Sequence, residues 1–142
     1  MATEGKNLSA IDKETTPSAA PYRFGIVVSE WNNEITDALL AGAHDALLEL
    51  GCIEKNIYMH KVPGSFELPI GAKLLINSRP LDAVITIGSV IQGETRHFEF
   101  VCQAVAQGVK DVSLQTDVPV IFCVLTDDTF EQAKARSGGK HG

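Results

Sequence analysis

The sequence predicts one α/β domain, in which helices cover both faces of a central sheet of four parallel strands. Two observations lead to this prediction. From residue 21 onward, short apolar runs alternate with longer segments of helical periodicity, which gives the order βαβαβαβα. Most of the short runs read as continuous apolar stretches, as in strands that are buried on both faces of a parallel sheet. The length of 142 residues suits a single hydrophobic core.

Four apolar runs, rich in β-branched residues, are the expected strands. They cover residues 23–29, 56–62, 82–88 and 119–126. Each run is followed by a short connection and then by a helical segment, so each step along the chain is expected to be a strand followed by a helix.

Four helical segments are expected to follow these strands. The first carries its apolar residues on one face, and Asn32 or Asn33 is expected to cap its start. The segments cover residues 33–50, 63–78, 95–117 and 127–137. The last of them is expected to be capped by Asp127 or Asp128.

The composition excludes two classes of partner. The formal net charge is -6, whereas binding to nucleic acid depends on clustered lysine and arginine. No segment approaches the roughly 18 apolar residues that a membrane span needs, so no membrane partner is expected. Cys52, Cys102 and Cys123 show no metal-binding spacing, and their odd number is typical of reduced thiols. We therefore expect a cytoplasmic protein without a metal site.

The first twenty residues differ in composition from the rest of the chain. They lack the apolar stretch of a secretory signal, and they carry Glu4, Asp12 and Glu14, which an arginine-rich transit peptide would lack. We therefore expect residues 1–20 to form a flexible N-terminal tail and residues 21–142 to form the α/β domain.

The carboxyl ends of the four strands are the expected location of a ligand site, because ligands of parallel α/β sheets bind there. The segments concerned are "SEWNN", "PGSFE", "SVIQGETRH" and "LTDD". In the third segment, the backbone N–H groups around Gly93 begin a helix and suit an anion such as phosphate. His97 follows at the positive end of that helix, where a neutral imidazole could accept or relay a proton. The alternative is an ordinary surface histidine at a helix start.

Each of the other candidate residues also has a structural alternative. Trp31 could fill the core or provide a stacking surface for a ring. Ser65 and Glu67 could hold a ligand, or they could only cap a helix. Phe122 could belong to the core or to a pocket, and Arg136 could be a solvated side chain or a clamp for phosphate.

Five motifs follow one another along the chain, namely "GIVVSEWN", "VPGSFELP", "DAVITIGSVIQGETRHFEFV", "VPVIFCVLTDDTFEQA" and "RSGGKHG". Together they make the chain resemble the lumazine synthase family of riboflavin biosynthesis, from about Tyr22 to Gly142. The resemblance implies a flavodoxin-like three-layer α/β/α sandwich. It also implies an enzyme that condenses 5-amino-6-(D-ribitylamino)uracil with 3,4-dihydroxy-2-butanone 4-phosphate, with no cofactor and no metal.

The resemblance also implies a role for each candidate residue. His97 matches the family's proton-transfer histidine. The pyrimidine would be bound by Trp31, Asn32, Ser65, Phe66, Glu67, Ser89, Val90, Ile91 and Phe122, with the last supplied by a neighbouring subunit. The phosphate would be bound by Gly93, Glu94, Thr95 and Arg136, with Glu94 offering its N–H group and pointing its carboxylate away. Trp31 replaces the family's usual phenylalanine, and the larger ring either narrows the pocket or favours flavin-like products.

Family members assemble as homopentamers, and some build icosahedral capsids from pentamers, so the resemblance implies a homo-oligomer with active sites between subunits. Members continue past "GGKHG" with a closing helix, and on this comparison the C-terminal helix is missing from the chain. Two other functions remain possible on the sequence. One is a flavin- or nucleotide-binding module without catalysis, and the other is a relative of archaeal-type riboflavin synthase.

Overall fold

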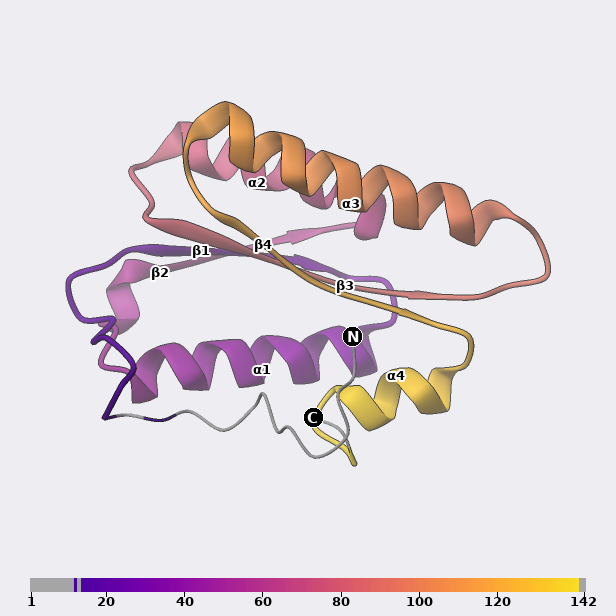
Figure 1. The fold of residues 1–142 in the computed structure, drawn as a ribbon, viewed down its shortest axis with the longest axis horizontal. Coiled ribbons are helices and arrows are strands. Elements are labelled where there is room, and N and C mark those ends of the chain that lie inside the picture. Colours follow the sequence, from indigo (N-terminus) through magenta and orange to yellow (C-terminus); the bar gives the residue numbers. More distant parts are fainter. Residues whose placement is uncertain (1–11, 13, 141–142) are drawn as a thin grey trace.

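A parallel four-stranded sheet forms the middle layer of a three-layer α/β/α sandwich (Figure 1). The computed structural model describes residue 12 and residues 14–140, so most of the predicted tail and the last two residues lie outside the described part. The strand order is β2-β1-β3-β4. Helices α2 and α3 cover one face of the sheet, and α1 and α4 cover the other. The predicted flavodoxin-like fold is thereby confirmed.

The elements follow the predicted order along the chain. The strands are β1 (Phe24–Ser29), β2 (Ile57–Val62), β3 (Ala83–Ile91) and β4 (Val120–Asp127). The helices are α1 (Asn33–Glu49), α2 (Leu68–Ser78), α3 (His97–Thr116) and α4 (Phe130–Arg136). Short 3-10 turns, η1 (Glu54–Asn56) and η2 (Ser65–Glu67), precede β2 and α2. None of the described helices is both long and apolar enough to cross a membrane.

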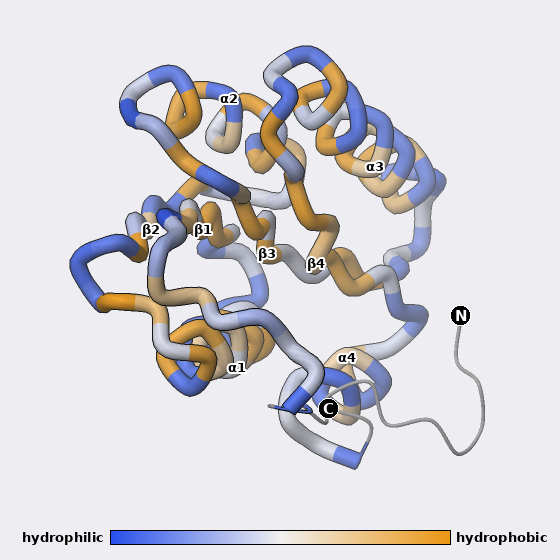
Figure 2. The backbone as a smooth tube through the Cα atoms, turned by 60° about the vertical axis from the view of Figure 1, so that its left-hand side comes forward, coloured by the Kyte–Doolittle hydropathy of each residue, from blue (hydrophilic) through white to orange (hydrophobic). Residues whose placement is uncertain are grey.

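The sheet is buried on both faces because successive residues of β1 enter different cores. Val27 packs with Leu68 of α2 in the core beneath α2 and α3. Ile26 and Val28 belong to the opposite core, which they share with Leu47 of α1. Figure 2 shows much of β1, β3 and β4 in hydrophobic colours at the centre of the molecule. This double burial explains why the two central strands, β1 and β3, are almost continuous apolar runs in the sequence.

The third strand extends further toward the carboxyl end of the sheet than the sequence predicts. It continues beyond residue 88 and ends at Ile91, which pairs with Asp127 of β4. The Gln92 N–H group then donates a hydrogen bond of 2.9 Å to the carbonyl oxygen of Asp127. The longer pairing brings the end of β3, and the loop that follows it, beside the end of β4.

The last helix begins later than the sequence predicts. Asp127 is the final residue of β4, and Thr129 occupies the N-cap position of α4. The hydroxyl oxygen of Thr129 accepts a hydrogen bond of 3.2 Å from the N–H group of Gln132. The prediction that Asp127 or Asp128 caps this helix was therefore wrong.

Gly88 allows η2 to approach β3 closely, which leads to a prediction about stability. A Cβ atom at this position would lie 2.5 Å from the Ser65 hydroxyl oxygen. We expect Gly88→Ala to lower the free energy of unfolding by about 1–3 kcal/mol, the usual cost of overpacking. Chemical denaturation measures this value. Gly42→Ala is the control, because a Cβ there meets nothing within 4 Å and should be neutral or stabilising. A Gly88→Ala protein as stable as the wild type would contradict the close approach.

Candidate active site

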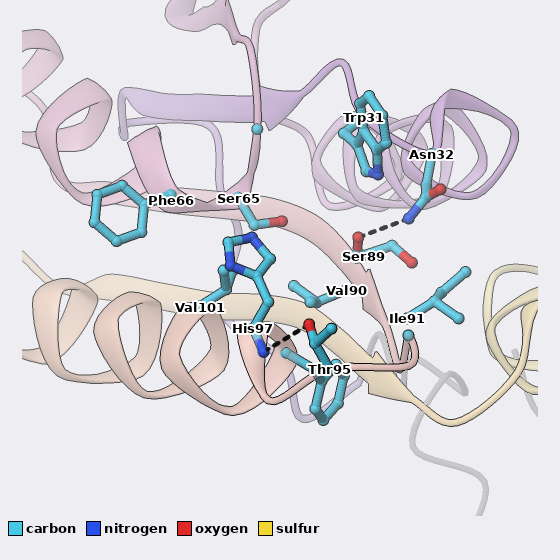
Figure 3. Close-up of a pocket in the computed structure, with 13 residues that line it drawn as sticks. Trp31, Asn32, Ser65, Phe66, Ser89, Val90, Ile91, Thr95, His97 and Val101 are labelled. Atoms are coloured by element: carbon cyan, nitrogen blue, oxygen red, sulfur yellow. Dashed lines mark hydrogen bonds between the residues drawn. The ribbon is translucent and has the colours of Figure 1, made fainter.

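A pocket of about 410 Å³ opens at the carboxyl ends of β1 and β3, beside the start of α3 (Figure 3). The segments that follow β1, β2 and β3 line it, together with the end of β3 and the first residues of α3. Ten residues predicted from the sequence line it, namely Trp31, Asn32, Ser65, Phe66, Ser89, Val90, Ile91, Gly93, Thr95 and His97. The structure therefore brings together residues that are far apart in the sequence. Trp31 and His97, the first and last of these ten, are 66 positions apart.

Trp31 lies in the turn that connects β1 to α1. Its backbone N–H group donates a hydrogen bond of 3.2 Å to the hydroxyl oxygen of Ser29, the last residue of β1. The side chain is 70% exposed, which excludes a role in the core of this chain. A large exposed aromatic ring at a strand end is suited to stacking on a flat ligand.

Asn32 connects this turn to the other wall of the pocket. It occupies the N-cap position of α1 in the left-handed conformation, with φ of 57°, but its side chain makes no capping hydrogen bond. Instead, the side-chain amide donates a hydrogen bond of 2.9 Å to the Ser89 carbonyl oxygen, as Figure 3 shows. Asn32 thus fixes the start of α1 against the end of β3.

Two serine hydroxyl groups at the pocket lack hydrogen-bond partners among the described residues. Ser65 lies in η2, and Ser89 lies near the end of β3. Both side-chain oxygens are buried and unpaired, although both residues line the pocket. Because a buried polar group without a partner costs about 1–3 kcal/mol, two such groups at one cavity indicate where a polar ligand would bind.

Glu67 does not line the pocket but supports one of its loops. Its carboxylate accepts a hydrogen bond of 2.9 Å from the N–H group of Gly64, which does line the pocket. This is the capping contact that the sequence left open as an alternative. The neighbouring Phe66 lines the pocket and is exposed.

The loop between β3 and α3 carries the predicted anion site and leads directly into His97. The N–H group of His97, the first residue of α3, donates a hydrogen bond of 3.3 Å to the Thr95 hydroxyl oxygen. In Figure 3 the imidazole extends from the start of α3 toward Ser65 across the pocket. Among the described residues, no partner takes the N–H groups of Glu94 and Thr95. Glu94 is exposed and is not part of the pocket lining.

Phe122 and Arg136 lie apart from the pocket of their own chain. Phe122 is exposed on β4, an edge strand of the sheet, and pairs with Thr86. Arg136 lies in the last turn of α4, where its guanidinium is 3.5 Å from the Asp127 carboxylate. A single chain therefore does not unite these two residues with the other ten.

The sequence analysis did not identify three residues of the pocket, Gly64, Phe98 and Val101. Val101 lies one helical turn after His97 and shares its face of α3. The helical spacing of these two residues was the signal that could have identified Val101.

The cysteines are not suited to act as nucleophiles. All three are free thiols, and burial raises the pKa of Cys123 and of Cys102. Desolvation likewise raises the pKa of Cys52, with the charge of Glu54 as a smaller cause. A raised pKa keeps a thiol protonated near neutral pH, and the thiolate is the reactive form.

Comparisons with known proteins agree with the motifs around this pocket. The sequence model of 6,7-dimethyl-8-ribityllumazine synthase matches residues 21–142. The 6,7-dimethyl-8-ribityllumazine synthase of Christiangramia forsetii is 61% identical, over all of this chain and 85% of the relative. Those of Flavobacterium johnsoniae and Parabacteroides distasonis are 58% and 47% identical over the whole chain, which spans 75% and 89% of their lengths. The chain belongs to the 6,7-dimethyl-8-ribityllumazine synthase family.

Proposed function

We propose that this pocket condenses 5-amino-6-(D-ribitylamino)uracil with 3,4-dihydroxy-2-butanone 4-phosphate to form 6,7-dimethyl-8-ribityllumazine, phosphate and water. The chain is thus a transferase that performs the penultimate step of riboflavin biosynthesis. Relatives of this name at 47–61% identity favour this function over a binding module without catalysis. The observation that carries the proposal for the site is the convergence of an exposed indole, an imidazole and two unpaired buried hydroxyls on one pocket.

The pyrimidine would lie between Trp31 and the end of β3. Stacking on the indole would orient the ring, and the hydroxyls of Ser65 and Ser89 would hydrogen-bond to its polar groups or its ribityl chain. The residues proposed to hold it are Trp31, Asn32, Ser65, Phe66, Glu67, Ser89, Val90, Ile91 and Phe122, the last from a neighbouring subunit. Since Glu67 does not line the pocket and already accepts the N–H group of Gly64, its part would be to shape this loop.

The phosphate of the four-carbon substrate would bind at the loop before α3. The free N–H groups of Glu94 and Thr95 support this proposal, and Gly93, where a Cβ would meet nothing within 4 Å, leaves the loop open to a ligand. Arg136 would supply the counter-charge. A phosphate held here would leave its carbon skeleton beside His97, the next residue but one after Thr95.

The reaction suits a histidine in this position. The 5-amino group adds to the ketone, a first water is lost to form an imine, and phosphate leaves by elimination. The second amine then adds to the remaining carbonyl and closes the ring with loss of a second water. Each step moves a proton, and His97 would accept and return protons as the general acid and base. Holding both substrates in one pocket would supply the larger share of the acceleration, up to about 7–11 kcal/mol.

The exposed apolar surface supports assembly into a ring. Phe66, Ile70 and Leu74 are exposed at intervals of four residues along η2 and α2, and Ile121 and Phe122 are exposed on the edge strand β4. Two different apolar surfaces on one chain suit a head-to-tail contact, which closes into a ring when the rotation permits. We propose a homopentamer in which Phe122 of one chain completes the pyrimidine pocket of the next.

Light scattering measures the assembly state. The expected mass is that of five chains, or of a larger icosahedral shell of pentamers. A monomer that nevertheless turns over both substrates would contradict a site shared between subunits.

A two-substrate assay tests the proposed function. Lumazine absorbance should appear at a rate that saturates in each substrate and exceeds the spontaneous condensation. Binding without turnover would favour the flavin- or nucleotide-binding module. Conversion of lumazine to riboflavin would instead favour the relative of archaeal-type riboflavin synthase.

Arg136→Ala should weaken the use of the phosphorylated substrate in particular. A hydrogen bond to a charged group contributes about 1.5–3 kcal/mol, so the KM for the butanone phosphate should rise about tenfold or more. The KM for the pyrimidine should change little. Steady-state kinetics with each substrate varied in turn measure both values, and an equal rise in both would contradict a phosphate role for Arg136.

A further inference from the structure

Asp127 is a buried carboxylate for which the fold alone gives no reason. It is the last residue of β4 and is 7% exposed. One carboxylate oxygen is buried without a hydrogen-bond partner, and the other lies 3.5 Å from a terminal nitrogen of Arg136. Burying a charged carboxylate costs folding free energy unless the charge is paired. The guanidinium of Arg136 is the charge that offsets this cost for Asp127.

The contacts of Arg136 use only one side of its guanidinium. The Nη1 atom donates a hydrogen bond of 2.9 Å to the Gln132 carbonyl oxygen and also faces Asp127. Within the described part of the chain, Nη2 and Nε have no partner. These two nitrogens form the edge of the fork that binds phosphate oxygens in pairs. Asp127 and Gln132 therefore hold the guanidinium by Nη1 and leave its phosphate-binding edge free.

Asp127 also contacts the proposed phosphate loop through its backbone. It pairs with Ile91, and its carbonyl oxygen accepts the N–H group of Gln92, the residue before Gly93. One residue thus joins the loop that offers backbone N–H groups to the helix that carries the counter-charge. Among the described residues, no other residue both hydrogen-bonds to this loop and pairs with Arg136.

We infer that Asp127 is a positioning residue, which sets the orientation of Arg136 toward the phosphate of the four-carbon substrate. The inference rests on the proposed function, and in particular on the role of Arg136. The nearby negative charge would itself disfavour phosphate, so the alternative is that Asp127 competes with phosphate for the arginine. The free Nη2 and Nε edge favours positioning, because a competitor would be expected to occupy that edge.

The test compares Asp127→Asn with Asp128→Asn. Both changes remove one negative charge at adjacent positions, but Asp128 is exposed and its side chain contacts no cation within 4.0 Å among the described residues. Asp127→Asn should raise the KM for the butanone phosphate roughly 3- to 10-fold, which corresponds to the net value of one hydrogen bond. Both kcat and the KM for the pyrimidine should stay within about twofold. Asp128→Asn should leave all three values unchanged.

A double-mutant cycle with Arg136→Ala shows whether Asp127 acts through the arginine. In the Arg136→Ala protein, Asp127→Asn should cause no further rise in KM, and it should restore stability by removing an unpaired buried charge. Inorganic phosphate serves as a probe of the same site. Its inhibition constant should rise in Asp127→Asn by about the same factor as the KM for the butanone phosphate.

Several results would overturn the inference. One is a lower KM for the butanone phosphate in Asp127→Asn, which would show that Asp127 competes with phosphate for Arg136. Another is an equal change of this KM by Asp127→Asn in the wild-type and the Arg136→Ala proteins, which would show that Asp127 does not act through the arginine. An unchanged KM in Asp127→Asn, together with a raised KM in Arg136→Ala, would reject the inference and leave the proposed function intact. If Arg136→Ala also leaves the KM for the butanone phosphate unchanged, the proposed phosphate role of Arg136 is itself wrong.

Discussion

Replacing His97 with alanine should slow lumazine formation by about 10- to 1000-fold, the range for a single acid–base group. His97 is the first residue of α3 and lines the pocket with Trp31 and Ser65. Its replacement by alanine removes the proton carrier and leaves the other residues of the lining in place. Because the side chain is exposed, the variant should fold normally. Turnover at saturating concentrations of both substrates, corrected for spontaneous condensation, measures the effect.

His60→Ala is the matched control for this prediction. His60 is exposed on the edge strand β2 and is not part of the pocket lining. The His60→Ala protein should form lumazine at the wild-type rate. Unchanged turnover in His97→Ala would remove the proton-transfer role, and an equal loss in both variants would indicate a general effect of the substitution.

Replacing Trp31 with alanine should weaken binding of the pyrimidine by about 5- to 150-fold. Stacking of a heteroaromatic ring on an aromatic side chain contributes about 1–3 kcal/mol in nucleic-acid complexes, and this value is converted here at RT near 0.6 kcal/mol. Trp31→Phe should retain most of the binding and most of the turnover. Calorimetric titration with the pyrimidine alone measures the affinity without catalysis.

The stability of Trp31→Ala separates stacking from packing. At 70% exposure, the indole should contribute little to the stability of the chain, so the free energy of unfolding should change by less than about 0.5 kcal/mol. A core tryptophan would instead cost about 3–5 kcal/mol. Riboflavin, which is larger than the substrate, should depend on the indole more strongly than the substrate does.

The location of the pocket could be predicted from the sequence because it follows from the strand pattern. Buried strands that alternate with helices predict a parallel sheet, and the carboxyl ends of parallel strands meet at one edge. Trp31, Ser65 and His97 each follow a strand or its connecting loop, so that pattern alone predicts that they converge. The pocket contains all three.

Contacts that depend on distant partners could not be predicted in the same way. The sequence predicts Asn32 or Asn33 as the cap of the first helix. Asn32 takes the N-cap position, yet its amide binds the Ser89 carbonyl oxygen, 57 positions away. The sequence also predicts Asp127 or Asp128 as the cap of the last helix, yet pairing with Ile91 extends β4 through Asp127, and Thr129 takes the N-cap position. In each case a partner from another strand competes with the local preference.

The roles of Phe122 and Arg136 stay predictions for a different reason. Phe122 lies on the edge strand, away from the pocket of its own chain, and family resemblance assigns it to a neighbour's pocket. Arg136 contacts Asp127 and Gln132 rather than the pocket. Helical periodicity predicts the helix that carries Arg136 but not the direction of so long a side chain.

The most direct test is a titration of tryptophan emission with the ribitylated pyrimidine. Trp31 is the only tryptophan in the chain, so all of this emission reports one position in the pocket. Stacking of the pyrimidine should quench it in a saturable way, at one ligand per chain and with a midpoint near the KM for the pyrimidine. His97→Ala should show the same quenching while its turnover falls. Turnover without any quenching would contradict the placement of the reaction in this pocket.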